Sequence, residues 1–223
     1  SVDDLPKAIE IIDRTQLRAL LGRYEKLGAT PNVCQSLLRP NVRQYSVGVS
    51  CNHNEGKRIF VAEKLRPTAA MCAGGTYVVA SPDERVASLV GDAVTELGLF
   101  GIAEVEVIKD VDTGELFLLE VNARPWVQYS LATRSGFDLL GFVLQPDRYD
   151  PRSECVTGRK WINFSDDIYT VFSRSEGMLV NKEISLFDYF KSMITANAFA
   201  FWTLKDPKPF LVSAFRRFLK RSH

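Results

Sequence analysis

Apolar residues recur at helical spacing in two stretches of the chain, and each stretch has its own start and stop signals. The first runs between Asp13 and Gly28. The second opens with Ser81, whose side chain we expect to cap the helix, and ends at Gly98. A spacing of three and four residues places the apolar side chains on one face of a helix. Both stretches are therefore predicted to be amphipathic helices.

Five shorter segments are rich in Val, Ile, Leu and Phe and are predicted to be strands. They cover residues 32–38, 43–51, 57–66, 101–109 and 115–122. The segment from Pro67 to Thr76 is expected to be a loop, and a further helix is expected over residues 137–144. Short polar connections join neighbouring strands, so these pairs are expected to be antiparallel. The mixture predicts an α+β fold, with a mainly antiparallel sheet and flanking helices.

A stretch of Pro, Asp and Arg residues over 146–152 divides the chain into two parts. We expect a lobe of residues 1–145 and a C-terminal extension of residues 146–223. In the last part of this extension, residues 209–221 have apolar positions near one helical stripe and basic residues beside it. This pattern predicts a helical tail, which either covers its own domain or docks on a partner or a membrane surface.

The last two predicted strands carry acidic side chains on one face. Alternation places Glu104 and Glu106 on the same face of the first strand. A three-residue turn at residues 112–114 then predicts that Glu106 lies opposite Glu120 and that Glu104 lies opposite Asn122. Directly opposed side chains have Cβ atoms about 5 Å apart, where two carboxylates would repel by about 3 kcal/mol at an effective dielectric constant near 20. The face is therefore either open to water or lines a cleft that binds a hard divalent cation.

An arginine follows the second strand, because Arg124 comes two positions after Asn122. The guanidinium group has a fixed fork of donors that suits phosphate and carboxylate groups. A lone arginine usually forms a surface ion pair, so the interpretation depends on the whole cluster. Carboxylates, an amide and an arginine at one strand end indicate a site for a metal ion and a nucleotide.

The composition excludes several other kinds of site. The formal net charge of +1 disfavours nonspecific binding of nucleic acid. The chain has two histidines, His53 and His223. This disfavours zinc sites built on paired histidines and Ser-His-Asp triads. Four cysteines without a CxxC motif are interpreted as reduced thiols of a cytoplasmic protein. No apolar run approaches the roughly 18 residues of a membrane-spanning helix, so no transmembrane segment is expected.

Residues 99–126 closely resemble the metal-binding core of the ATP-grasp superfamily. That core has a strand with a glutamate, then a hairpin, then a strand that ends in Glu-x-Asn-x-Arg. The matching residues in this chain are Glu106, Glu120, Asn122 and Arg124. The resemblance implies that the first three residues ligate one or two Mg²⁺ ions, or Mn²⁺, on ATP. It also implies that Arg124 holds an acyl phosphate.

The resemblance extends to other parts of the chain. The basic strand end at Lys64 and Arg66 is similar to the segment near the phosphates, so both residues are expected to stabilise the transferring group. The segment over 33–38 resembles the interdomain hinge that binds adenine, although the family commonly has glutamate there. Adenine contacts are expected from three hinge residues and from two apolar residues that otherwise belong to an ordinary core: Gln35, Ser36, Leu37, Ile108 and Leu118.

The fold that the resemblance implies is the second lobe of an ATP-grasp enzyme, with the first lobe upstream of Ser1. The activity that it implies is an ATP- and Mg²⁺-dependent ligase that joins a small-molecule carboxylate, such as an amino acid, to an amine through an acyl phosphate. Three alternatives stay open, namely a non-catalytic nucleotide-binding or interaction module, a fragment that is inactive without its first lobe, and a kinase that acts on a hydroxyl group. The oligomeric state also stays open, with a homodimer among the options.

Overall fold

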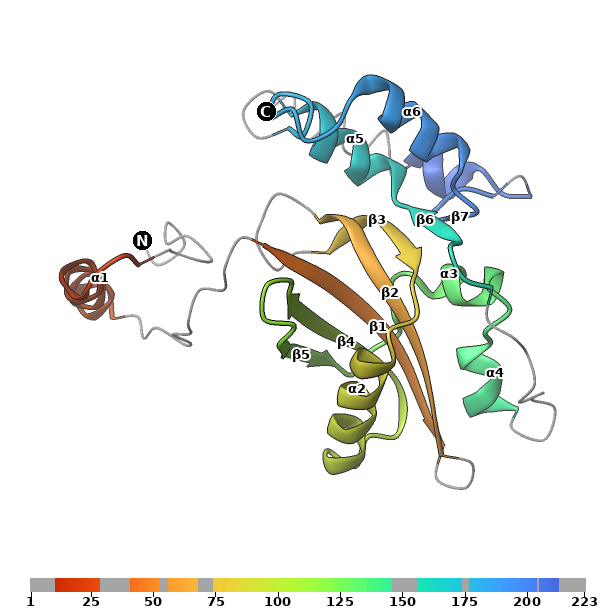
Figure 1. Ribbon diagram of the computed structural model, residues 1–223, viewed down its shortest axis with the longest axis horizontal. Coiled ribbons are helices and arrows are strands. Elements are labelled where there is room, and N and C mark those ends of the chain that lie inside the picture. Colours follow the sequence, from red (N-terminus) through yellow and green to blue (C-terminus); the bar gives the residue numbers. More distant parts are fainter. Residues whose placement is uncertain are drawn as a thin grey trace. The chain divides into compact units, whose positions relative to one another are not determined.

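Seven strands form one sheet in the part of the chain that the structure describes (Figure 1). The computed structural model describes residues 11–28, 41–52, 56–67, 74–145, 156–173, 177–203 and 205–212. The order across the sheet is β5-β4-β1-β2-β3-β6-β7. In chain order the strands are β1 (Val42–Asn52), β2 (Gly56–Pro67), β3 (Gly75–Ala80), β4 (Gly101–Asp110), β5 (Leu116–Asn122), β6 (Lys160–Ile162) and β7 (Ala198–Phe199). Neighbouring strands are antiparallel except for β6 and β7, so the expected α+β class is confirmed.

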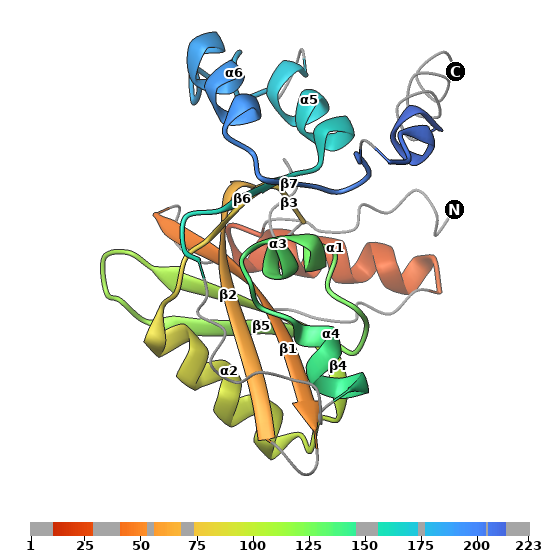
Figure 2. The same ribbon diagram turned by 90° about the vertical axis from the view of Figure 1, so that its right-hand side faces the viewer.

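Helices flank the sheet on both faces. They are α2 (Glu84–Glu96), α3 (Tyr129–Arg134), α4 (Leu139–Leu144), α5 (Phe164–Phe172) and α6 (Leu186–Ile194). Figure 2 shows α2 and α4 on opposite sides of β1 and β2. The sheet and these helices belong to one compact unit, residues 41–223.

Residues 1–40 form a separate compact unit, in which the described element is α1 (Arg14–Lys26). The carboxylate of Asp13 accepts hydrogen bonds from the amides of Thr15 and Gln16, at 2.7 and 2.8 Å. This arrangement satisfies backbone donors that the first turn of a helix leaves without partners. The helix predicted over 13–28 is confirmed.

Valines cover the face of the sheet that packs against α2. The cluster includes Val47 and Val49 of β1, Val61 of β2, and Val105 and Val107 of β4, which pack with three buried valines of the helix: Val86, Val90 and Val94. Every second side chain of a strand lies on the same face, so β4 directs its intervening residues to the opposite side. The burial of each valine is worth about 1.5 to 3 kcal/mol. This layer fixes the strands that carry the acidic residues.

Trp126 closes over the opposite face. It belongs to a buried cluster with Phe60 and Leu139, and its ring lies 5.5 Å from that of Phe60. A Cβ atom on Gly48 would lie 2.6 Å from the indole and 2.8 Å from Leu139. Only glycine therefore lets the indole lie directly on β1. Gly48 pairs with Glu104 across the sheet, so Trp126 covers the face that carries the acidic residues.

The structure corrects the expected start of α2. The N-cap residue is Asp83, whose side chain accepts hydrogen bonds from the amides of Arg85 and Val86 at 3.1 and 3.2 Å. Ser81 was the expected cap, but its amide donates to the carbonyl of Val61. The competing aspartate two positions later is the stronger cap because it also attracts the positive end of the helix dipole.

Before residue 145, two further elements were not expected. Strand β3 begins at Gly75, inside the expected loop from Pro67 to Thr76, and pairs with β2. Helix α3 precedes α4, and α4 confirms the helix expected around residues 137–144. The expected strand over 32–38 and the connection over 146–152 lie outside the described residues.

Residues after position 145, which were expected to be an extension, contribute to the same sheet. β6 pairs with β3, and β7 pairs with β6. The tail helix expected over 209–221 is described only as far as residue 212, where residues 208–212 are helical. No helix in the described ranges is long and apolar enough to cross a bilayer. Cys51, the one cysteine within those ranges, is a buried free thiol.

Candidate functional site

Two carboxylates oppose each other across the hairpin of β4 and β5. Glu106 pairs with Glu120, and Glu104 pairs with Asn122, as the alternation of side chains predicted. On its other side, β4 pairs with β1, where Ser46 lies opposite Glu106. These residues form the carboxylate face, a name used below for Glu104, Glu106, Glu120 and Asn122 with the adjoining part of β1.

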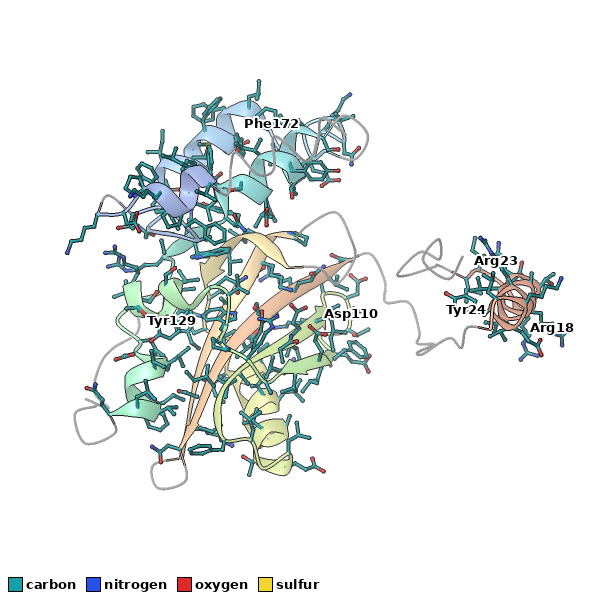
Figure 3. The ribbon with its side chains drawn as sticks, turned by 180° about the vertical axis from the view of Figure 1, so that it is seen from behind. Arg18, Arg23, Tyr24, Asp110, Tyr129 and Phe172 are labelled. Atoms are coloured by element: carbon teal, nitrogen blue, oxygen red, sulfur yellow. The ribbon has the colours of Figure 1, made fainter. Side chains whose placement is uncertain are left out.

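The turn of the hairpin is one residue longer than expected. The amide of Asp110 donates to the carbonyl of Glu115 at 2.9 Å, so residues 111–114 form the loop. The side chain of Asp110, labelled in Figure 3, accepts hydrogen bonds from the amides of Asp112 and Thr113, both at 2.9 Å. An aspartate that captures the amides of the next residues is a strong turn former. This side chain selects the four-residue loop.

A β-bulge restores the predicted pairing of the acids. Val107 pairs with Leu118, but the next pair is Glu106 with Glu120. Leu119 is therefore an extra residue on β5, as in other bulges of antiparallel sheets. Without the bulge, the four-residue loop would place Leu119 opposite Glu106. The extra residue in the strand compensates for the extra residue in the turn.

Lys64 of β2 reaches the carboxylate face and forms an ion pair with Glu106. The ammonium nitrogen lies 2.8 Å from Oε1 of Glu106, and the two side chains are only 1% and 8% exposed. Burial raises the pKa of Glu106, and the nearby charges of Glu104 and Glu120 raise it further, while Lys64 lowers it. The net direction is upward. Burial therefore outweighs the favourable contact with the lysine.

Glu104 is held from two sides. Its Oε1 accepts a hydrogen bond from the hydroxyl of Ser46 at 2.8 Å, and its Oε2 lies 2.8 Å from Nη1 of Arg124. The indole Nε1 of Trp126 donates to the oxygen of Ser46 at 2.7 Å. No role was expected for Ser46 or Trp126. Their link to Glu104 depends on the order of the strands, which no local pattern in the sequence contains.

Glu120 and Asn122 form the open end of the carboxylate face. The side-chain amide of Asn122 donates to Oε1 of Glu120 at 2.7 Å. Glu120 is exposed and Asn122 is half-buried. Arg124 follows with a side chain that is 50% exposed. The structure thus brings together the three expected metal ligands, Arg124 and Lys64.

The donor chemistry of this face fits a hard divalent cation. The described residues contain no group of three or more His, Cys, Asp or Glu side chains that could hold a metal by themselves. Mg²⁺, however, is usually bound through one or two carboxylates, with phosphate oxygens and waters completing its six ligands. Glu106 and Glu120, with the amide of Asn122, supply ligands of that type and number. A bound cation would also offset the charge of two carboxylates that face each other across the hairpin.

Arg66 is not brought to the carboxylate face. Its guanidinium donates to both oxygens of Asp167 on α5, at 2.8 and 2.9 Å. It also lies 4.0 Å from the ring centroid of Tyr77, and Thr76 donates to the same carboxylate at 2.7 Å. Both charged partners are buried. Arg66 was expected to contact phosphate groups. In the structure its side chain instead joins α5 to the sheet.

The residues expected near adenine are only partly described. Gln35, Ser36 and Leu37 lie outside the described residues. Ile108 is buried, and the four-residue loop places Phe117, rather than Leu118, opposite it. The structure therefore does not pair the two residues of the expected apolar floor.

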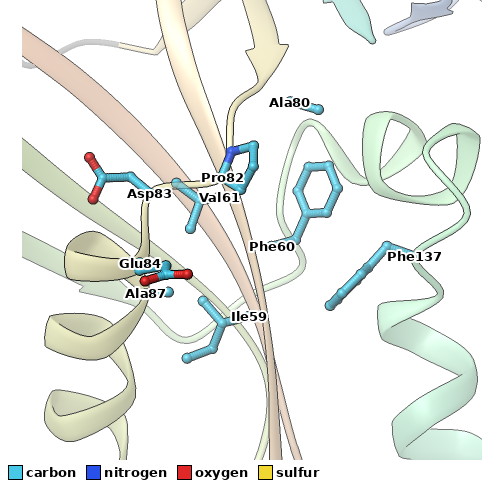
Figure 4. A pocket seen from close by; sticks show the side chains of 9 residues that line it. All are labelled: Ile59, Phe60, Val61, Ala80, Pro82, Asp83, Glu84, Ala87 and Phe137. Carbon is cyan, nitrogen blue, oxygen red and sulfur yellow. The ribbon is translucent and has the colours of Figure 1, made fainter. Parts of the chain in front are cut away.

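A cavity of about 140 Å³ lies elsewhere, between β2 and α2 (Figure 4). Its lining is mostly apolar and includes Ile59, Phe60, Pro82, Ala87 and Phe137. None of its lining residues belongs to the carboxylate face. The cavity is therefore separate from the candidate site.

Several solved structures are similar to this chain. A pyruvate carboxylase from Rhizobium etli is 16% identical, with a TM-score of 0.45, over 66% of this chain and 14% of that one. The biotin carboxylase domain of the Hydrogenobacter thermophilus 2-oxoglutarate carboxylase, in complex with MgADP, ADP and bicarbonate, is 17% identical, with a TM-score of 0.42, over 55% of this chain and 29% of that one. The urea carboxylase of Kluyveromyces lactis is 18% identical, with a TM-score of 0.42, over 64% of this chain and 13% of that one.

The chain spans less than a third of the length of each of these three structures. No protein-family model and no curated protein matches the chain.

Proposed function

We propose that the carboxylate face is the metal and nucleotide end of an ATP-grasp active site, and that the protein is an ATP-dependent ligase. The observation that carries this proposal is the direct pairing of Glu106 with Glu120, beside Asn122, on a face that also holds Lys64 and Arg124. Two opposed carboxylates with adjacent cationic side chains are suited to a metal ion that carries phosphate groups. An ordinary wet surface does not explain the burial of Glu106.

Glu106, Glu120 and Asn122 would hold the divalent ion, which when bound supplies positive charge to the phosphate oxygens of ATP. Lys64 adds a second positive charge, and it is already within 2.8 Å of Glu106. Arg124 is half exposed and presents the planar fork of donors that binds carboxylate or phosphate oxygens. Arg66 has no part in this arrangement, because Asp167 holds it.

The reaction class proposed is the joining of a carboxylate to an amine. A carboxylate oxygen of the substrate would attack the γ-phosphorus of ATP, with release of ADP. The amine would then attack the acyl carbon, and inorganic phosphate would leave. Arg124 would hold the oxygens of the transferring group, where negative charge is concentrated during both steps.

A non-catalytic nucleotide-binding module is the second candidate. The observation that favours it is that the chain's own cations already neutralise two of the acids, since Lys64 pairs with Glu106 and Arg124 pairs with Glu104. Such pairs reduce the demand for a metal ion. A module of this kind would bind nucleotide without releasing ADP.

The test is ADP release by the full-length protein with Mg²⁺ and pools of carboxylates and amines. We expect release that requires all three, and a loss of about 100-fold or more in Glu120→Gln, because charge stabilisation by a metal ion is worth several kcal/mol. Glu115→Gln is the matched control, because Glu115 is an exposed acid of the same hairpin outside the carboxylate face. Full activity in Glu120→Gln would refute the proposal. Nucleotide binding without ADP release would favour the non-catalytic module.

A further inference from the structure

Glu104 lies on the carboxylate face but is not among the ligands of the proposed metal ion. It precedes Glu106 by two positions and is 3% exposed. A buried carboxylate is costly unless it has partners for its oxygens. The two oxygens of Glu104 have different partners, and these partners indicate what the residue does.

The first oxygen is fixed by a chain of hydrogen bonds whose direction is determined. An indole N–H can only donate, so the oxygen of Ser46 must accept the 2.7 Å bond from Trp126. The single hydroxyl proton of Ser46 is then left for Glu104, whose Oε1 accepts it at 2.8 Å. Trp126 is itself fixed by its packing on Gly48. Glu104 is therefore anchored to the core of the domain.

The second oxygen faces Arg124. Oε2 of Glu104 lies 2.8 Å from Nη1 of the guanidinium, whose side chain is 50% exposed, while Glu104 is 4% exposed. One partner of the pair is thus anchored in the core, and the other extends to the surface. Arginine has five N–H donors, so a contact at one nitrogen leaves donors for an anion.

From this geometry we infer that Glu104 is a positioning residue, which holds the Arg124 guanidinium in place for the phosphate or carboxylate oxygens of the substrate. The inference rests on the proposed function for the identity of that anion. It assigns the chain Trp126, Ser46, Glu104 and Arg124 a single task, which is to orient one flexible cationic side chain from the core.

The substitution Glu104→Gln tests this role with little change in volume. The amide oxygen of glutamine accepts the Ser46 hydroxyl, whereas its NH₂ group faces Arg124 and cannot accept from it. We expect kcat/KM for the carboxylate substrate to fall about 10- to 100-fold, in the range typical of residues that orient a functional side chain. The affinity for Mn²⁺-nucleotide is expected to stay within about twofold, because Glu104 is not a ligand.

A double-mutant cycle separates positioning from a general structural effect. If Glu104 acts through Arg124, Glu104→Gln has no further effect on kcat/KM in an Arg124→Met background. Equal losses in both backgrounds would overturn the inference. Ser46→Ala provides a second variant, with a smaller loss in the same direction, should Glu104→Gln fold poorly.

Chemical modification gives a readout that does not depend on activity. Ion pairing slows the reaction of an arginine with phenylglyoxal, so Arg124 is expected to react several-fold faster in Glu104→Gln and in Ser46→Ala, as measured by peptide mass spectrometry. Arg134, an exposed arginine of α3, is the internal control and should not change. Equal rates at Arg124 in wild type and variants would overturn the positioning role. If the wild type releases no ADP, the proposed function fails, while the modification rates still decide whether Glu104 holds Arg124.

Discussion

Lys64 and Glu106 form an ion pair that is almost completely removed from water, with side chains 1% and 8% exposed. Removing two charges from water costs several kcal/mol, which their mutual attraction only partly returns. Burial is also the main reason why the pKa of Glu106 is raised. The pair is thus better explained by the chemistry of the carboxylate face than by a contribution to stability.

This explanation predicts a strongly non-additive set of substitutions. Lys64→Met and Glu106→Leu each remove one member of the buried ion pair and leave the other charge buried, so each is expected to reduce the free energy of unfolding by about 3 to 5 kcal/mol. The double variant Lys64→Met/Glu106→Leu is expected to be close to wild type or more stable, because it buries two apolar side chains instead. Urea unfolding of all three variants measures the effect. A double variant that is clearly less stable than wild type would show instead that the pair contributes to stability.

At the level of elements, helix α2 has two candidate N-cap residues, Ser81 and Asp83. The side chain of Asp83 accepts hydrogen bonds from two backbone amides, whereas the amide of Ser81 donates to the carbonyl of Val61 on β2. We expect Asp83→Ala to reduce the free energy of unfolding by about 1 to 2 kcal/mol. Ser81→Ala, the matched control, is expected to change it by less than about 0.5 kcal/mol. Thermal or urea unfolding measures both variants. A larger loss in Ser81→Ala than in Asp83→Ala would show that Ser81 is the N-cap, as the sequence suggested.

The same aspartate predicts a dependence on pH. Burial by itself would raise the pKa of Asp83, but a 2.7 Å bond from Lys109 and the two amide bonds lower it overall. The stability that Asp83 contributes is therefore present above the pKa of the unfolded chain and is lost as pH falls through the folded pKa. Asp83→Asn keeps the cap without the charge. Its deficit relative to wild type should be larger at pH 7 than at about pH 3.

The hairpin of β4 and β5 shows which features of the fold could be predicted from the sequence. The pairing of Glu106 with Glu120 follows from the period of two along a strand, and it was predicted. The four-residue turn and the bulge at Leu119 were not predicted. A hairpin with a three-residue turn and no bulge pairs the same two glutamates as a hairpin with a four-residue turn and a bulge. Asp110 is the residue that could have indicated the longer turn, because its side chain accepts hydrogen bonds from two amides of the loop.

Contacts between distant elements were beyond the reach of sequence patterns. Lys64 and Arg66 are two positions apart, yet one reaches Glu106 and the other reaches Asp167. Their separation follows from the irregular pairing of β2 with β3 at this point. Strand β3 was also missed, since its six residues adjoin Gly74 and Gly75, which indicate a loop.

At the level of the whole molecule, the sheet runs through the position where the sequence suggested a boundary. β6 covers the edge of β3, and Asp167 neutralises the buried Arg66. A protein that ends at residue 145 would expose that edge and leave the arginine without its carboxylate. Both changes are strongly unfavourable.

We therefore expect removal of residues 146–223 to give an unfolded or aggregated protein. Removal of residues 1–40 is the matched control, and it should leave a folded monomer or oligomer, because residues 41–223 form their own compact unit. Size-exclusion chromatography and circular dichroism measure both outcomes. A soluble product of residues 1–145 with an unchanged melting temperature would establish the boundary instead.

Because Leu119 is an extra residue in β5, the effect of a deletion in this hairpin depends on its position. Deleting Leu119 itself yields a flat ladder in which Glu106 still meets Glu120. Deleting Val121, only two positions later, moves Asn122 and everything beyond it by one place, and a shift of one place exchanges the inward and outward sides of a strand. A deletion at the bulge is thus expected to keep the two acids paired, whereas a deletion after it turns Asn122 away from them.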